Sequence, residues 1–369
     1  MVYNQIKHVL RHFDFQGEFV SAEELHSGNI NNTFRLHYRQ KGGEIRDYVL
    51  QQINTYVFKK PDEVMSNVQR VTEHQRAAME KEGVDTARRV LRLVSCKDGG
   101  YMYRDAQGRC WRVYDYITGA TAYDRVENPE YFRQAGVAFG SFQKQLFDFP
   151  AEELHETIPN FHDTRKRFYA FVAAVAEDKA GRVKEVEKEI DFFFDRRKMM
   201  SGIVDAIERG EIPLRVTHND TKVNNVMLDA ETGEGLCVID LDTVMPGSAL
   251  YDYGDAIRFG ASTAAEDEPD TSKIALDMDL FRVFTEGFIS QVRGALTQKE
   301  LEMLPLGIKV MTAELAMRFF TDYLDGDLYF KVKSPNHNLV RARAQMKLLE
   351  DIEERYDQIS AIIQEILQK

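Results

Sequence analysis

Asp220, Asn225 and Asp240 are the residues of this 369-residue chain whose types and spacing best suit a chemical reaction. Asp220 follows a β-branched run, Asn225 lies five positions further on, and Asp240 closes a second apolar run. Phosphoryl transfer needs a carboxylate that orients the acceptor hydroxyl and accepts its proton, and oxygen ligands that hold Mg²⁺ on the phosphates. Mg²⁺ prefers carboxylate and amide oxygens to softer ligands. We therefore expect Asp220 to be catalytic and Asn225 and Asp240 to bind the metal.

The spacing of these residues is more specific than any one of them. A His-x-Asp triplet such as His218 to Asp220 is common, but one followed by Asn and by an apolar strand ending in Asp is typical of kinases. The alternative is a β-hairpin whose turn holds Asn and Asp through turn preference alone. Turn chemistry explains neither His218 nor an Asp at the end of a buried run, so the catalytic interpretation is favoured.

Two longer stretches extend this pattern. They read His218-Asn219-Asp220-Thr221-Lys222-Val223-Asn224-Asn225-Val226 and Val238-Ile239-Asp240-Leu241-Asp242-Thr243-Val244-Met245-Pro246-Gly247. Together they resemble the aminoglycoside phosphotransferase and choline kinase superfamily, and closely resemble its bacterial N-acetylhexosamine 1-kinases. The likeness includes Tyr48–Asn54 near the N-terminus.

The resemblance implies a kinase that uses ATP and Mg²⁺ and phosphorylates the anomeric hydroxyl of N-acetylglucosamine or N-acetylgalactosamine. The alternative acceptors are an aminoglycoside, choline or ethanolamine, homoserine, or another sugar. A protein kinase is disfavoured because Asp240 is followed by Leu241 and Asp242 instead of Phe-Gly. A scaffold without activity would be expected to have lost Asp220 or Asp240, and the chain retains both.

We expect an α+β protein of the two-lobed, protein-kinase-like kind, with a nucleotide-binding lobe at residues 1–118. Its predicted elements follow the order of a kinase small lobe: a helix over Gln5–Phe13, strands over Phe19–Leu25, over Thr33–Tyr38 and from Tyr48, a helix from Pro61 to about Gly83, and strands over Val90–Cys96 and Cys110–Ile117.

Several residues of this lobe are expected to contact the nucleotide. Gly28 and Asn32 lie in and beside the turn between the first two strands, where backbone N–H groups can approach phosphates. Tyr114, Asp115 and Ile117 lie in the segment expected to be the hinge that meets adenine. The alternative for this segment is an ordinary amphipathic strand.

One part of the kinase pattern is missing from the third strand. Such kinases usually carry a Lys there that binds the α- and β-phosphates. Here Gln51 and Gln52 follow Leu50, and the next lysines, Lys59 and Lys60, lie beyond the strand. We expect Gln51 to contact the nucleotide, but a glutamine supplies hydrogen bonds and no charge. Either ATP binding is weaker, or the loop backbone and magnesium compensate.

Residues 119–369 are expected to form a larger, mostly helical lobe that carries the catalytic loop, the metal site and the acceptor pocket. In the last helix, apolar residues recur at alternating spacings of three and four from Leu349 to Ile366. That pattern fits either a coiled-coil seam or packing onto the lobe. Packing is favoured because barely three heptads carry it, so we expect a monomer or a weak dimer.

Three residues are expected to support the catalytic loop. His218 is interpreted as a structural imidazole. Lys222 is close enough to Asp220 to lie near the transferred phosphate, with a solvated lysine as the alternative. The resemblance implies that Asp252 braces the loop from beneath, and the alternative is a helix cap.

The resemblance also implies that Phe259, Arg318 and Tyr329 bind the sugar, together with Asp220 and Asp240. The alternative for Arg318 is an ion pair with Glu314 or Asp322, each four residues away on one helix face. The alternative for the two aromatic residues is core packing.

Composition narrows the function further. Hydrophobic and charged contents of 43% and 29% are those of a folded globular protein. The net charge of −12 argues against nucleic acid or an anionic membrane as a partner. Cys96, Cys110 and Cys237 lack metal-type spacing and are expected to be reduced thiols. No signal core precedes them, so we expect a cytoplasmic protein. The acidic segment 266–270 either attracts cationic substrates or is a solvated loop, which is favoured.

Overall fold

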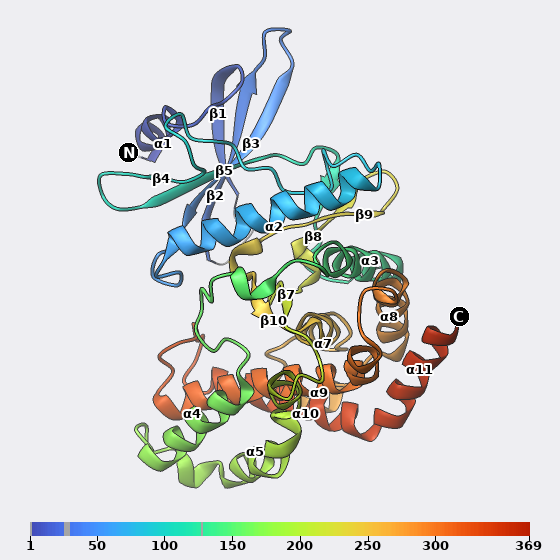
Figure 1. Cartoon of the computed structure of the whole chain (residues 1–369). Helices are drawn as coiled ribbons and strands as arrows, with labels where there is room; N and C mark the ends of the chain where they lie inside the picture. Colours follow the sequence, from blue (N-terminus) through green and yellow to red (C-terminus); the bar gives the residue numbers. More distant parts are fainter. Residues whose placement is uncertain (1, 26–29, 127) are drawn as a thin grey trace.

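Five antiparallel strands form the sheet of the N-terminal lobe in the computed structural model, which describes residues 2–25, 30–126 and 128–369 (Figure 1). The strand order is β1-β2-β3-β5-β4. The bounds are β1 Glu18–Leu25, β2 Asn32–Arg39, β3 Ile45–Ile53, β4 Tyr103–Arg104 and β5 Cys110–Asp115. Gly28, which was expected to lie near the phosphates, is outside the described residues.

Side chains alternate along each strand and therefore point to both faces of this sheet. A helix covers each face. Leu36, Leu50 and Val113 pack on one face with α1 (Val2–Leu10). The opposite face is covered by α2 (Pro61–Lys81), which runs between the sheet and the second lobe (Figure 1). Pro61 suits the first turn of α2 because its missing N–H has no helical partner there. The alternation directs Arg112 and Tyr114 of β5 toward α2.

The prediction of a strand over Val90–Cys96 is wrong. Among these described residues only Leu93 and Cys96 form isolated bridges, to Tyr114 and Phe13. The segment divides its backbone hydrogen bonds between β5 and the turn after α1, so no continuous ladder can form. The short strand β4 takes its place in the sheet. In addition, the first helix ends at Leu10 instead of Phe13, and β5 ends at Asp115 instead of Ile117.

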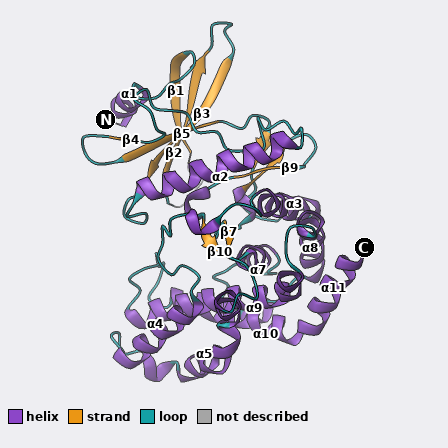
Figure 2. Ribbon diagram, viewed as in Figure 1, coloured by secondary structure: helices purple, strands orange, loops and turns teal. Residues whose placement is uncertain are grey.

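The second lobe is helical, with two small sheets on the side that faces the first lobe (Figure 2). These sheets pair β7 (Arg215–Thr217) with β10 (Met245–Gly247), and β8 (Val226–Asp229) with β6 (Ala120–Thr121) and β9 (Gly235–Val238). The helices are α3 Pro129–Gln145, α4 Thr164–Glu177, α5 Glu187–Met200, α6 Gly202–Glu208, α7 Ala249–Gly260, α8 Met278–Val292, α9 Gln298–Asp325, α10 His337–Glu354 and α11 Tyr356–Gln368.

Glycines allow the central helices to approach closely. A Cβ on Gly287 of α8 would lie 2.1 Å from the backbone oxygen of Arg133 in α3, and one on Gly254 of α7 would lie 2.3 Å from that of Gly307 in α9. Only hydrogen at these positions lets the backbones meet. The helices beneath the two small sheets are therefore closely packed.

The predicted last helix is in fact two helices, because α10 ends at Glu354 and α11 begins at Tyr356. The apolar residues of the expected seam turn inward: Leu349, Ile352, Ile359 and Ile363 are fully buried. These residues therefore pack within the lobe, as was favoured over a dimer seam.

Cys96, Cys110 and Cys237 are buried free thiols. Among the described helices, none combines the length and apolar character that crossing a bilayer requires.

Candidate active site

Two loops at the edge of the small sheets bring the predicted catalytic residues together. The first follows β7 and contains Asp220, and the second follows β9 and contains Asp240. Asn219 and Asp240 both adopt left-handed backbone conformations, with φ of 67° and 59°. Non-glycine residues in this region carry strain that the surrounding structure must hold in place, and such strain concentrates at functional sites.

Asp252, in the first turn of α7, fixes the first loop. It is 1% exposed, and its two carboxylate oxygens accept hydrogen bonds from the backbone N–H groups of His218 at 2.9 Å and Asn219 at 2.8 Å. Gln143 of α3 donates a third at 2.7 Å. Burial raises the pKa of Asp252, and His218 and these donors oppose that rise. The helix itself is capped by Ser248, so Asp252 binds the loop instead of capping its own helix.

His218 joins the two loops. Its Nδ1 accepts from the backbone N–H of Asp220 at 3.2 Å, so Nε2 carries the ring hydrogen and donates to the carbonyl of Ile239 at 3.0 Å. Thr243 adds a second link, because its hydroxyl donates to the carbonyl of His218 at 2.7 Å. The imidazole thus sets the spacing between Asp220 and Asp240.

The side chain of Asp220 is partly exposed and already carries two partners. Lys222 Nζ lies 2.7 Å from one carboxylate oxygen, and Asn225 Nδ2 donates to the other at 3.2 Å. Burial lowers the pKa of Lys222, but the nearby carboxylates outweigh burial and the pKa is raised overall. Lys222 is therefore a partly buried cation that pairs with Asp220, which argues against the alternative of a solvated lysine.

Asp240 is exposed to solvent and lies in a strongly anionic environment. Desolvation by the surrounding protein atoms, followed by the charges of Asp242 and Asp220, raises its pKa to about 7, while Arg112 and Lys222 act in the opposite direction. A bound cation would relieve this repulsion. Asn225 uses its amide nitrogen on Asp220, which leaves the amide oxygen as the atom that can serve a metal.

This donor set fits Mg²⁺ better than a metal held by protein alone. Within residues 2–25, 30–126 and 128–369, no three His, Cys, Asp or Glu side chains are arranged to hold a metal ion. Mg²⁺ is usually bound by one or two carboxylates together with waters and substrate phosphates. Asp240 and Asn225 are the residues that could hold it.

Gln51 lies where the resemblance places the phosphate-binding lysine. Its side chain is hydrogen-bonded to Arg112, a residue that the sequence did not lead us to expect there. Its amide oxygen accepts from Arg112 Nε at 3.0 Å and from a terminal nitrogen of Arg112 at 2.8 Å. Its amide nitrogen donates to Thr33 at 3.2 Å. An arginine inside the buried strand Cys110–Asp115 was the available signal, since a buried charge requires a partner. Asn32 is exposed at the start of β2.

The expected hinge residues lie at the end of β5. Tyr114 is buried, and its hydroxyl has no hydrogen-bond partner among the described residues. The backbone N–H of Asp115 donates to the carbonyl of Arg92 at 2.9 Å, and its carboxylate pairs with Arg46 at 2.9 Å. Ile117 follows the strand and packs against the main core. The N–H of Asp115 is thus engaged within the protein.

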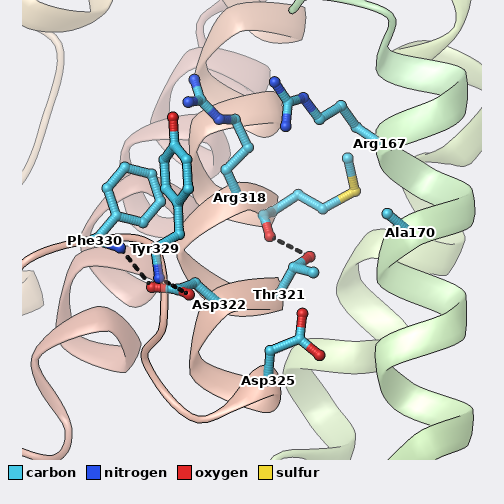
Figure 3. Close-up of a pocket in the computed structure, with 9 residues that line it drawn as sticks. Arg167, Ala170, Arg318, Thr321, Asp322, Asp325, Tyr329 and Phe330 are labelled. Carbon is cyan, nitrogen blue, oxygen red and sulfur yellow. Dashed lines mark hydrogen bonds between the residues drawn. The ribbon is translucent and has the colours of Figure 1, made fainter. Parts of the chain in front are cut away.

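Arg318 and Tyr329 line one cavity of about 140 Å³ in the helical lobe, with Arg167, Phe330 and residues of α9 around them (Figure 3). The guanidinium groups of Arg167 and Arg318 lie side by side in this view. Burial, followed by the charge of Arg318, lowers the pKa of Arg167. Phe259 does not line this cavity and packs against the main core from α7. The structure therefore groups two of the five residues expected to bind the acceptor, and Asp220 and Asp240 do not line this cavity.

Asp322 shapes this cavity. Its carboxylate accepts from the backbone N–H groups of Tyr329 at 2.7 Å and Phe330 at 2.9 Å (Figure 3). It also accepts from the backbone N–H of Leu328 at 2.9 Å and from the side chain of Asn338 at 2.8 Å. Asp322 therefore orders the segment that presents Tyr329 and is not the ion-pair partner of Arg318.

Arg318 is held mainly by aromatic rings. It lies 5.2 Å from the ring centre of Phe161 and 5.7 Å from that of Phe330. Its contact with Glu314 is a long 3.9 Å, and Glu314 makes its closer bond to His162 at 2.9 Å. The ion pair proposed as the structural alternative is thus loose, which leaves the guanidinium suited to bind a ligand.

The acidic segment 266–270 forms contacts within the protein. Glu266 pairs with Arg258 at 3.1 Å, Asp267 with Lys333 at 2.8 Å, and Glu268 with Lys273 at 3.6 Å. Asp270 caps a short helix through Ser272. These pairs favour the structural interpretation of the loop over attraction of a cationic substrate.

The chain resembles known proteins in both sequence and fold. Residues 21–277 match the phosphotransferase enzyme family. A microcompartment-associated aminopropanol kinase is similar in structure, with a TM-score of 0.62 at 16% identity over 97% of this chain and 98% of the other. An amicoumacin kinase in complex with AMP-PNP and Ca²⁺ gives 0.59 at 12% over 96% and 94%. A choline kinase from Cryptosporidium parvum gives 0.54 at 14% over 95% and 93%. These similarities establish the protein-kinase-like fold, as the sequence predicted.

Proposed function

The chain belongs to the phosphotransferase enzyme family, and we propose that it transfers the γ-phosphoryl group of ATP to the anomeric hydroxyl of an N-acetylhexosamine. The observation that carries the kinase part is the meeting of Asp220, Lys222, Asn225 and Asp240 on two loops braced by Asp252 and His218. The choice of acceptor rests on the resemblance of residues 218–226 and 238–247 to N-acetylhexosamine 1-kinases.

In the proposed reaction Asp220 orients the acceptor hydroxyl and accepts its proton late, because the transition state is loose and needs little prior deprotonation. Lys222, 2.7 Å from Asp220, lies where it can bind the transferred group as negative charge develops there. Mg²⁺ held by Asp240 and Asn225 would neutralise charge on the β- and γ-phosphates. His218 and Asp252 keep the carboxylate in place without touching substrate.

The cavity beside α9 supports a neutral acceptor. A sugar offers no charge to bind, so its site needs fixed hydrogen-bond donors and an aromatic wall. Arg318 and Tyr329 supply donors, and Phe330 supplies a ring. A cationic acceptor such as choline would instead meet the paired guanidinium groups of Arg167 and Arg318. We propose Phe259 as a more distant contributor, since it lies on the helix that carries Asp252.

The test is to measure ATP consumption with N-acetylhexosamines, other sugars, aminoglycosides, choline, ethanolamine and homoserine. We expect turnover with N-acetylglucosamine or N-acetylgalactosamine and a product phosphorylated at C1. Asp220→Asn should lower turnover by roughly a hundredfold or more, because it keeps the size of the side chain and removes its charge. ATP binding should persist in this variant.

Asp279→Asn is the matched control, because Asp279 is an exposed carboxylate in the first turn of α8. Its turnover should equal that of the wild type. A phosphate on the 6-hydroxyl, or good aminoglycoside turnover without hexosamine turnover, would refute the proposed acceptor. Near-normal turnover of Asp220→Asn would refute the catalytic assignment.

A further inference from the structure

Arg112 is a fully buried cation at the boundary between the two lobes. It is 1% exposed and lies on β5 directly opposite Gln51 of β3 in the strand register. Two of its nitrogens donate to the amide oxygen of Gln51, and a third donates to the carboxylate of Asp242. Kinases of this fold carry a lysine on the third strand, at the position that Gln51 occupies here. Arg112 lies directly across from that position on the neighbouring strand.

The surroundings of Arg112 replace the usual ion pair of that lysine. In protein kinases the third-strand lysine pairs with a glutamate of the lobe's main helix. Here the corresponding helix α2 presents Met65, whose sulfur is 3.9 Å from Arg112. A glutamine on the strand and a methionine on the helix are both uncharged. The charge that both positions lack is supplied by Arg112 and Asp242.

Asp242 ties this cation to the metal-binding loop. It lies two residues after Asp240 and is 3% exposed. Its second oxygen accepts from the side chain of Asn31 at 2.7 Å, and Asn31 in turn accepts from the backbone N–H of Asn54 at 2.9 Å. Asn31 immediately precedes β2, so residues of the first lobe hold Asp242 from two sides.

A purely structural role explains this arrangement poorly. Burying a guanidinium and a carboxylate costs desolvation energy that their attraction often fails to recover, and apolar residues frequently do as well at such positions. Asp242 lies two residues after Asp240, so the buried pair adjoins the loop that is proposed to hold the metal. Charges in such a water-poor site are weakly screened and interact over several ångströms.

We propose that Arg112 is the fixed cation of the nucleotide-phosphate site, supplying from β5 the charge that β3 lacks at Gln51. The inference rests on the proposed use of ATP and extends it to how the phosphates are recognised. Asp242 and Gln51 position the guanidinium, and Asn31 positions Asp242. Affinity for the phosphates of a nucleotide therefore depends on a residue outside the third strand.

The experiment measures binding of adenosine, ADP and AMP-PNP by calorimetry, without turnover. Arg112→Met should weaken binding of ADP and AMP-PNP at least tenfold and change adenosine binding less than twofold. Gln51→Lys combined with Arg112→Met moves the charge to the opposite strand and should restore most of the lost affinity. Arg104→Gln is the control, because Arg104 lies on the neighbouring strand β4 and forms an exposed ion pair with Asp62 of α2.

Arg112→Met leaves Asp242 buried without its partner, so thermal unfolding is measured in parallel. If that variant fails to fold, Arg112→Met combined with Asp242→Asn removes both charges and is measured against Asp242→Asn alone. Equal losses for adenosine and ADP in a folded variant, or no rescue by Lys at position 51, would overturn the proposal. Failure of the wild-type chain to bind any nucleotide would instead refute the proposed use of ATP, and this inference with it.

Discussion

Replacing Asp252 by Asn tests how the loop that carries Asp220 is held in place. The substitution preserves the shape of the side chain and removes one acceptor oxygen and the charge. Three donors converge on this carboxylate, namely the backbone N–H groups of His218 and Asn219 and the side chain of Gln143, at 2.7 to 2.9 Å. The asparagine oxygen can serve one side of this arrangement, and its NH₂ group then faces a donor on the other.

The expected loss follows from that count. At least one buried donor is left without an acceptor, at about 1–3 kcal/mol, and the remaining bonds lose the assistance of charge. We expect the free energy of unfolding to fall by about 2–4 kcal/mol in total. Displacement of the loop should also lower kcat by about tenfold or more, because small misplacements of a catalytic group are costly.

Urea unfolding followed by circular dichroism, together with steady-state kinetics, measures both effects. Asp279→Asn is again the matched control, since Asp279 lies in the first turn of α8 as Asp252 lies in that of α7, but is exposed. It should change stability by less than about 0.5 kcal/mol. Asp252 does not brace the loop if its Asn variant unfolds at the same urea concentration as the wild type and the control, with unchanged kcat.

Four further outcomes are expected. Asn225→Ala should raise the Mg²⁺ concentration needed for half-maximal rate, and magnesium titrations that superimpose on wild type would reduce Asn225 to a turn residue. Between pH of about 4 and about 7 the folded state holds a proton on Asp240 that the unfolded state releases, because its pKa is raised from 3.8 to about 7. The contribution of Asp240 to the free energy of unfolding should therefore fall as pH rises through this window, and Asp240→Asn should abolish that part of the pH dependence in urea titrations. In the same window apparent Mg²⁺ affinity should weaken as pH falls, since protons compete for the carboxylate. Arg318→Ala should raise the sugar KM strongly with little change in the ATP KM or the Tm, whereas a large loss of stability without a sugar-specific defect would support a structural role.

Local rules account for the parts of the fold that the sequence predicted. The helix from Pro61 begins with a proline suited to a first turn and carries an apolar stripe, and both signals act within a few residues. The strands around Leu36 and Leu50 could be predicted because apolar and polar residues alternate along a strand when one of its faces is buried. Where neighbours far away in sequence compete for one backbone, as in residues 90–96, the same rules predicted a strand that does not form.

The sequence by itself also located the candidate site and predicted its chemistry, because Asp220, Asn225 and Asp240 lie within 21 positions of one another and their spacing forms the motif. It could not reveal the partners of Gln51 and Asp252. Arg112 is 61 residues from Gln51 and 130 from Asp242, and Gln143 is 109 from Asp252. Only the tertiary structure decides such contacts, since the pairing of β3 with β5 and the packing of α3 near α7 bring them together. The positive charge that β3 lacks at Gln51 can therefore be supplied by Arg112 of β5. No local sequence pattern predicts such a substitution of one strand for another.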